Sequence, residues 1–123
     1  MDLTPLFRSV NETESHAAGT NVFSKGDPAT TMYVVKEGRV ELVLNEVVIE
    51  EVRPGGVFGE MALIDKGVRS ATARVREACV LVTVDERRFA FLCQQTPYFG
   101  LQMMRLLVAR IRKMDDWVRS ENV

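Results

Sequence analysis

The chain has 123 residues, of which 46% are hydrophobic, and a formal net charge of −1. This length can bury a core without disulfides or metals but is too short for two domains of ordinary size, so we expect one domain over residues 1–123. Acidic and basic residues are interspersed, and no basic face emerges that would favour DNA binding by this chain. Because His16 is the single histidine, a multi-histidine metal site and a metal-dependent jelly-roll enzyme are excluded.

Cysteine content and hydropathy indicate where in the cell the chain is expected to reside. Cys79 and Cys93 are too few for a disulfide scaffold and lie among apolar neighbours, which favours a reducing cytoplasm. No apolar run approaches the roughly 20 residues that span a bilayer. The N-terminus, with Asp2 and Arg8, lacks the apolar segment of a signal peptide. We therefore expect a cytoplasmic protein that does not insert into membranes.

The first two thirds of the chain are dominated by a β pattern. Residues 3–10 fit a short helix or an arm, and the polar residues 11–16, with His16 expected in a solvated loop, lead into strands. The β-branched segments, separated by Gly, Asn or Pro, are residues 32–35, 40–44, 47–52, 72–75 and 78–84. Short strands at this spacing predict a mainly β fold with flanking helices, in which about residues 17–84 form an antiparallel β-barrel or double-stranded β-helix jelly roll.

Residues 58–63 and 69–71 combine the groups that bind a small cyclic phosphate. A cyclic nucleotide offers a singly charged phosphodiester and a ribose 2′-hydroxyl, so its site needs backbone N–H groups, a cation and an acceptor. Gly59 lets the backbone approach a ligand, and residues 61–63 can form one helical turn whose unpaired N–H groups would face the phosphate. Arg69 can bind the exocyclic oxygens in a bidentate manner, while Glu60 accepts from the ribose. The predicted ligand-binding residues are Phe58, Gly59, Glu60, Met61, Ala62, Leu63, Arg69, Ser70 and Ala71.

These residues resemble the phosphate-binding cassette of the cyclic nucleotide-binding domain family, which includes kinase regulatory subunits, gated channels and bacterial catabolite activators. Upstream, residues 19–28 and 32–41 look like the first hairpins of the family, with Gly26-Asp27-Pro28 turning between strands, so the resemblance covers about residues 17–120. It implies that Glu60 holds the ribose and Arg69 the phosphate. The remaining phosphate oxygens would be bound by the amides near Ala62, Ser70 and Ala71.

The same resemblance implies a sensor that does not catalyse a reaction, with cAMP or cGMP as its ligand and no cofactor. The hydroxyl of Ser70 does not decide between the two nucleotides. In some eukaryotic family members a hydroxyl at this position reaches the amino group of a syn guanine, but bacterial cAMP-binding members also carry serine. We expect cAMP to be favoured over cGMP.

Two helices are predicted after the β segment, over about residues 85–120. Asp85 is a plausible N-cap for a helix over about residues 86–95, which Thr96-Pro97 ends, and a second helix runs from about 97 to about 119. Apolar residues of the second helix recur every three or four positions: Leu101, Met104, Leu107 or Val108, Ile111, Met114 and Val118. We expect the first half of this stripe to cover the barrel mouth and residues 114–118 to remain available to a partner.

The resemblance implies that this helix closes over the nucleotide base and, in dimeric members, pairs with its twin. A homodimer through the C-terminal helix is therefore one expectation, and an unidentified effector protein would read the helix movement. Arg105 and Trp117 are candidates for capping the base, although a single Trp near a helix end is more often a packing residue.

Three alternatives remain open at the level of sequence. Glu60 and Arg69 could form an ion pair that only pins a loop. The domain could be a ligand-free interaction or dimerisation module with the same fold. The chain could also be a fragment of a channel or kinase, which would change its partners and leave the ligand unchanged.

Overall fold

The computed structural model describes residues 2–7, 12–64 and 67–121, with the side chains of Thr4 and of residues 117–121 left undescribed. The chain divides into two compact units, Asp2–Arg87 and Arg88–Val123.

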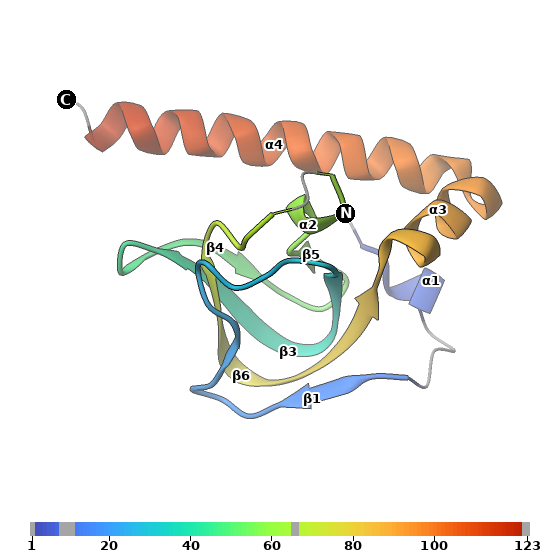
Figure 1. Cartoon of the computed structure of the whole chain (residues 1–123), viewed down its shortest axis with the longest axis horizontal. Coiled ribbons are helices and arrows are strands. Elements are labelled where there is room, and N and C mark those ends of the chain that lie inside the picture. Colours follow the sequence, from blue (N-terminus) through green and yellow to red (C-terminus); the bar gives the residue numbers. More distant parts are fainter. Residues whose placement is uncertain (1, 8–11, 65–66, 122–123) are drawn as a thin grey trace. The chain divides into compact units, whose positions relative to one another are not determined.

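The first unit is built from antiparallel strands. They are β1 (Glu14–His16), β2 (Asn21–Phe23), β3 (Met32–Leu44), β4 (Val47–Val52), β5 (Val57–Phe58) and β6 (Thr72–Val84). The strand order is β1-β6-β3-β4, while β2 also pairs with β6 and β5 with β3 (Figure 1). The predicted fold class is confirmed: an antiparallel jelly-roll sheet followed by C-terminal helices. The strands that the structure describes do not close the sheet into a complete barrel by pairing β1 with β4.

The two long strands differ from the predicted pattern. Residues 32–35 and 40–44 belong to one strand, β3, and residues 72–75 and 78–84 belong to one strand, β6. Gly38, which suggests a strand end, instead lies within β3 at a positive φ of 86°. There the β3–β6 register shifts, and a Cβ atom at Gly38 would collide with the Ala78 carbonyl oxygen. The glycine therefore marks an irregularity inside a continuous strand.

Two further expectations about the N-terminal part are wrong. His16 is not in a loop: it ends β1, opposite Cys79, is half-buried and lies 3.1 Å from the Glu14 carboxylate. The segment around Gly26-Asp27-Pro28 does turn the chain, but β2 does not form a hairpin with β3 and pairs with β6 instead. The short helix predicted near the N-terminus is present as α1 (Thr4–Phe7).

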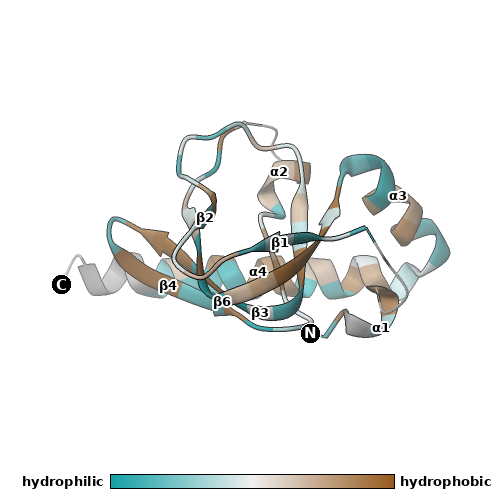
Figure 2. Cartoon of the chain, turned by 90° about the horizontal axis from the view of Figure 1, so that it is seen from below, coloured by the Kyte–Doolittle hydropathy of each residue, from teal (hydrophilic) through white to brown (hydrophobic). Residues whose placement is uncertain are grey.

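The core of the first unit lies between the long strands and the short segments that pair with them. Burial alternates at the start of β6, where Ala73 and Val75 are buried and Arg74 and Arg76 are exposed, and Figure 2 shows hydrophobic and hydrophilic residues along the strands. The core cluster consists of Phe23, Val35, Val40, Val52, Phe58, Ala73, Val75, Cys79 and Leu81. Two aromatic members of the cluster and Tyr33, which packs against it, form one group, because the ring of Phe58 stacks on Tyr33 at 5.2 Å and lies 5.9 Å from Phe23.

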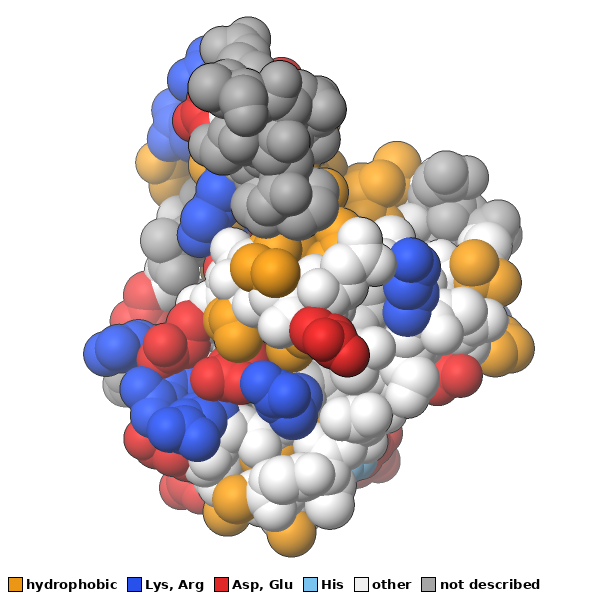
Figure 3. All heavy atoms as spheres, turned by 90° about the vertical axis from the view of Figure 1, so that its left-hand side faces the viewer, with side chains coloured by type: hydrophobic (Ala, Val, Ile, Leu, Met, Phe, Trp, Pro, Cys, Tyr) orange, Lys and Arg blue, Asp and Glu red, His pale blue; other side chains and the backbone are white. Residues whose placement is uncertain are grey.

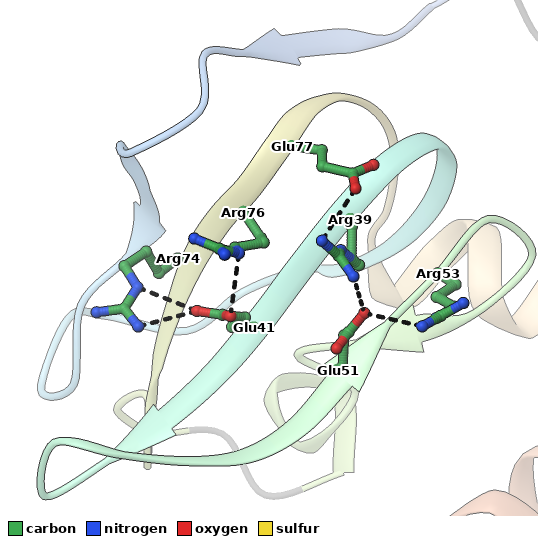
Figure 4. Close-up of polar contacts among 7 residues, drawn as sticks. All are labelled: Arg39, Glu41, Glu51, Arg53, Arg74, Arg76 and Glu77. Carbon is green, nitrogen blue, oxygen red and sulfur yellow. Dashed lines mark hydrogen bonds and ion pairs between the residues drawn. The ribbon is translucent and has the colours of Figure 1, made fainter.

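Charged side chains of opposite sign alternate on the outer surface of the sheet. Arg39 contacts Glu51 at 2.8 Å and Glu77 at 3.0 Å, while Glu41 accepts from Arg74 at 2.9 Å (Figure 4). Cross-strand pairing creates these contacts, since Arg39 lies opposite Glu77 and Glu41 opposite Arg74. Figure 3 likewise shows acidic and basic side chains next to one another. This surface is compensated in charge, in agreement with the interspersed sequence.

The second unit contains the predicted C-terminal helices, apart from Glu86 and Arg87 at the start of the first one. Helix α3 (Glu86–Gln95) and helix α4 (Pro97–Glu121) have nearly the predicted bounds. They meet at a tight corner, where the Phe99 amide donates to Thr96 O at 2.9 Å and the Phe99 ring lies edge-on to Phe89 at 5.4 Å. None of the helices in the described residues is long and apolar enough to cross a membrane.

The expectation that the first half of the apolar periodicity on α4 is covered is wrong for most of its residues, although Leu107, the alternative to Val108, is half-buried. Leu101 and Met104 are exposed, as are Val108 and Ile111, whereas Phe99 and Met103 are buried. Phe99 and Met103 are four residues apart and lie on a different face of the helix from Leu101 and Met104. Helix α4 therefore carries apolar residues on two faces. The three- and four-residue periodicity in the sequence predicted burial of the face that is mostly exposed. The side chain of Val118 lies outside the described residues.

Candidate functional site

The candidate site is formed where the residue 58–63 segment meets the residue 67–71 segment. Strand β5 pairs with β3, with Phe58 opposite Tyr33, and is followed by Gly59 and the short helix α2 (Met61–Ile64). The second segment is attached to the turn after β2. The Arg69 amide donates to Asp27 O at 2.8 Å, and the Gly26 amide donates to Arg69 O at 2.8 Å. These two bonds fix the backbone from which the Arg69 side chain extends.

Arg69 is buried, with only 6% of its surface exposed. Its Nη1 donates to Gly59 O at 3.2 Å and its Nη2 donates to Thr31 O at 2.8 Å. Its Nε atom is buried and has no hydrogen-bond partner among the described residues. An unpaired buried donor is costly, and more so in a charged group, so an acceptor from outside the described residues would stabilise this atom.

The surroundings of Arg69 are aromatic as well as polar. The guanidinium carbon lies 4.0 Å from the centre of the Phe23 ring and 5.7 Å from that of Tyr33. Burial lowers the pKa of Arg69, while the Tyr33 side chain and the charges of Asp27 and Glu60 act in the opposite direction. The residue stays a cation, because arginine loses its proton only at very high pH. The site thus holds a desolvated positive charge.

Glu60 is the second buried charged residue of the site, with 5% exposure. It directly follows Gly59, whose carbonyl accepts from Arg69. The structure therefore brings the two predicted ionic residues into one buried region. The charge of Glu60 acts on Arg69, while the hydrogen bonds of Arg69 go to the carbonyls of Gly59 and Thr31.

The expectation that the α2 amides are unpaired is wrong at two positions. The Ala62 amide donates to Gly59 O at 3.3 Å, and the Leu63 amide donates to Glu60 O at 3.1 Å. Because α2 is a single turn, its first amides bond to carbonyls three residues back, as in a 3₁₀ turn. A phosphate would have to share these two N–H groups with their carbonyl partners.

The other predicted residues occupy different environments. Phe58 is fully buried and Ala62 nearly so, whereas Met61 and Ser70 are exposed and Ala71 and Leu63 are half-buried. On α4, Arg105 is exposed and its Nη1 donates to the Tyr98 hydroxyl at 3.1 Å. The side chain of Trp117 lies outside the described residues.

Three residues of the Arg69 environment were missed by sequence reasoning. Phe23, Thr31 and Tyr33 come from β2, from the loop before β3 and from β3, and each approaches Arg69. Thr31 acts through its backbone carbonyl, for which the residue type carries no signal. Phe23 and Tyr33 read as ordinary strand residues, and only the pairing of the strands brings them to Arg69.

The chain is similar in sequence to known proteins. Residues 13–96 match the family model described as the cyclic nucleotide-binding domain. The cyclic AMP receptor protein of Thermus thermophilus is 31% identical over 102 residues, which cover 79% of this chain and 47% of the receptor. The cyclic nucleotide-gated potassium channel mll3241 of Mesorhizobium japonicum is 36% identical over 80 residues, 65% of this chain and 22% of the channel.

A solved structure supports the same relationship. The Thermus thermophilus catabolite activator protein superposes with a TM-score of 0.75 at 28% identity, covering 90% of this chain and 60% of that chain. The chain spans less than half the length of the receptor and of the channel. The matched region includes both segments of the site and ends close to the end of α3.

Proposed function

Because the chain belongs to the cyclic nucleotide-binding domain family, we propose that it is a sensor that binds cyclic AMP in preference to cyclic GMP. The family is a regulatory domain rather than a catalytic one, and membership supports the binding of a cyclic nucleotide. We further propose that the chain catalyses no reaction, needs no cofactor and passes the binding event on through its C-terminal helices.

The observation that carries the proposal is the buried Nε atom of Arg69, which has no hydrogen-bond partner among the described residues. A guanidinium that is 6% exposed and holds two carbonyls at 2.8 and 3.2 Å is already fixed before a ligand arrives. Its unpaired edge suits an anion with paired oxygens, and a cyclic phosphodiester is such an anion. Phosphate binding would therefore give the Nε donor of Arg69 a hydrogen-bond acceptor, and the lack of such an acceptor otherwise destabilises the fold.

In this proposal Glu60 accepts a hydrogen bond from the ribose 2′-hydroxyl. Its buried carboxylate adjoins Gly59, where the close packing around Arg69 brings sugar and phosphate recognition together. The backbone amides near the exposed Ser70 and the half-buried Ala71 would donate to phosphate oxygens next to Arg69. The amides of Ala62 and Leu63 would contribute as shared donors.

The preference for cAMP draws its support from the relatives. The Thermus relative is a cyclic AMP receptor protein, whereas the channel relative is described only as cyclic nucleotide-gated. Ser70 by itself is compatible with either base. We propose Arg105 and Trp117 as candidates for contact with the base; Tyr98, which accepts a hydrogen bond from Arg105, would orient that side chain.

Calorimetric titration of the purified chain with cAMP, cGMP and 5′-AMP tests the proposal. Micromolar or tighter binding of cAMP, weaker binding of cGMP and little binding of 5′-AMP is the expected order. Equal affinity for 5′-AMP would contradict recognition of the cyclic phosphate. Amide spectra recorded during the titration test the signalling step, which would be wrong if all shifts stayed within residues 58–71.

A second function of the same fold is a dimerisation module without a ligand. The observation that favours it is the row of exposed apolar residues Leu101, Met104, Val108 and Ile111 on α4, called the α4 stripe below. If calorimetry showed no binding of any of the three nucleotides and the chain formed a stable dimer, this second function would be favoured. The buried arginine argues against it, since a domain freed from an anionic ligand gains nothing from a desolvated, incompletely paired cation.

A further inference from the structure

Gly59, the Arg69 guanidinium and the Phe23 ring lie in mutual contact. A Cβ atom placed on Gly59 would lie 2.9 Å from Nη1 of Arg69 and 3.4 Å from Cε2 of Phe23. The centre of the Phe23 ring is 4.0 Å from the guanidinium carbon, which is a close cation–π distance. The absence of a side chain at Gly59 thus leaves space for a cation that Phe23 supports.

Phe23 is itself held in place by its neighbours. It is 91% buried and ends β2, opposite Ala73 of β6, just after a register shift in the β2–β6 pairing. Its ring lies 6.1 Å from that of Tyr33 and 5.9 Å from that of Phe58, and these two rings stack on each other at 17°. The aromatic group formed by Phe23, Tyr33 and Phe58 is therefore a rigid support, and Phe23 is its member nearest the cation.

We propose that Phe23 is a positioning residue for phosphate recognition, acting through Arg69. The two carbonyl acceptors fix the Nη atoms, and the negative face of the Phe23 ring holds the guanidinium from a further direction. Phe23 thereby keeps the unpaired Nε edge in one orientation before the ligand binds, which reduces the ordering cost of binding. This inference rests on the proposed contact between Arg69 and the cyclic phosphate.

Fluorination of a single ring separates this role from simple packing. Replacing Phe23 by phenylalanines with one, three and five ring fluorines keeps the ring nearly the same size while its face becomes progressively less negative. We expect cAMP affinity to fall step by step, reaching about 5- to 30-fold for the fully fluorinated ring, the range for a desolvated cation–π contact. Phe7, which is also buried, gives the matched control, and its fluorination should leave affinity unchanged.

A double-mutant cycle with Phe23→Leu and Arg69→Ala tests whether the effect passes through Arg69. Phe23→Leu should weaken cAMP binding in the wild-type background and have little effect once Arg69 is absent, because the two changes remove one contact. In spectra of the ligand-free protein, the Arg69 side-chain N–H signals should also lose their ring-current shift in Phe23→Leu and keep it in Phe7→Leu.

The outcomes separate this inference from the proposed function. If the wild-type chain binds cAMP, Arg69→Ala weakens it and the fluorinated series is flat, the positioning role is overturned while the function stands. Equal losses from Phe23→Leu in both backgrounds would likewise overturn it, since they would indicate packing alone. If the wild-type chain binds neither cyclic nucleotide, the function and the inference are overturned together.

Discussion

Gly59 and Arg69 are in such close contact that the glycine cannot carry a side chain without displacing the arginine. A Cβ atom at Gly59 would lie 2.9 Å from Nη1, the same atom that donates to the Gly59 carbonyl. Gly59 also has a positive φ of 75°, which favours glycine. One residue therefore supplies an acceptor, a backbone turn and empty space to the buried cation.

Gly59→Ala should weaken cAMP binding about 10-fold or more, because the guanidinium must leave its position to accommodate the methyl group. The free energy of unfolding should also fall, by about 1–2 kcal/mol for the positive φ. Gly19→Ala is the matched control: its φ is 87°, but nothing lies within 4 Å of an added Cβ. Calorimetry and urea unfolding of both variants check the prediction, and an equal loss of affinity in Gly19→Ala would contradict it.

Arg69→Ala should weaken cAMP binding by roughly 2–4 kcal/mol, the range for leaving a charged partner unpaired. Arg69→Lys should recover only part of the loss, because an ammonium group cannot reproduce a bidentate contact. Arg74→Ala is the control, since Arg74 is an arginine of the sheet surface that pairs with Glu41. Titration calorimetry of the three variants measures the effect, and unchanged affinity in Arg69→Ala would remove the assigned role.

Gly38→Ala should destabilise the first unit by about 3 kcal/mol or more, since overpacking adds to the cost of the positive φ. An added Cβ would meet the Ala78 carbonyl oxygen and lie 2.7 Å from the Cys79 Cα, and neither backbone atom can move away easily. Urea unfolding monitored by circular dichroism provides the measurement. A loss no larger than that of Gly19→Ala would show that β6 adjusts to the methyl group.

The sheet-surface ion pairs should make stability depend on pH through Glu51. The hydrogen bond from Arg39 is the main cause that lowers the Glu51 pKa, and the charges of Arg39 and Arg53 add to it. A lowered folded-state pKa contributes stability above the unfolded-state pKa, and this contribution disappears as the pH falls through the folded-state value.

We therefore expect Glu51→Gln to be less stable than the wild type at neutral pH and to approach the wild-type stability as the pH falls through the folded-state pKa of Glu51, below which the carboxylate is protonated in both states. Urea unfolding at a series of pH values gives the difference. In an Arg39→Gln background the difference should shrink at every pH. If the stability difference between the wild type and Glu51→Gln grew as the pH fell, the Glu51 pKa would be raised in the folded state and the prediction would be wrong.

The α4 stripe should mediate self-association. Leu101, Met104, Val108 and Ile111 follow a spacing of three, four and three residues, which places them on one exposed face of the helix. Sedimentation velocity over a concentration series should show a dimer that Ile111→Glu dissociates. Ala109→Glu introduces the same charge at an exposed position about 100° around the helix from Val108, and it should leave the dimer intact. A monomer at all concentrations would contradict the prediction.

The sequence by itself determined the parts of this protein whose signals are local. Asp85, Thr96 and Pro97 set the bounds of α3 and the start of α4 because helix ends depend on neighbouring backbone groups. The family relationship followed from Gly59, Glu60 and Arg69, since a phosphate-binding segment needs particular residue types at short separations.

Tertiary structure decided what depends on pairing and burial. The positions of Phe23, Thr31 and Tyr33 around Arg69 arise from segments 36 to 46 residues away in the chain, brought together by the sheet. The continuity of β3 through Gly38 and the exposed face of α4 were also hidden, because a glycine can end a strand or bend it and a helix with two apolar faces has no unique orientation. Residue type determines local chemistry, whereas contacts with residues distant in the chain determine which residues surround a site and which faces are buried.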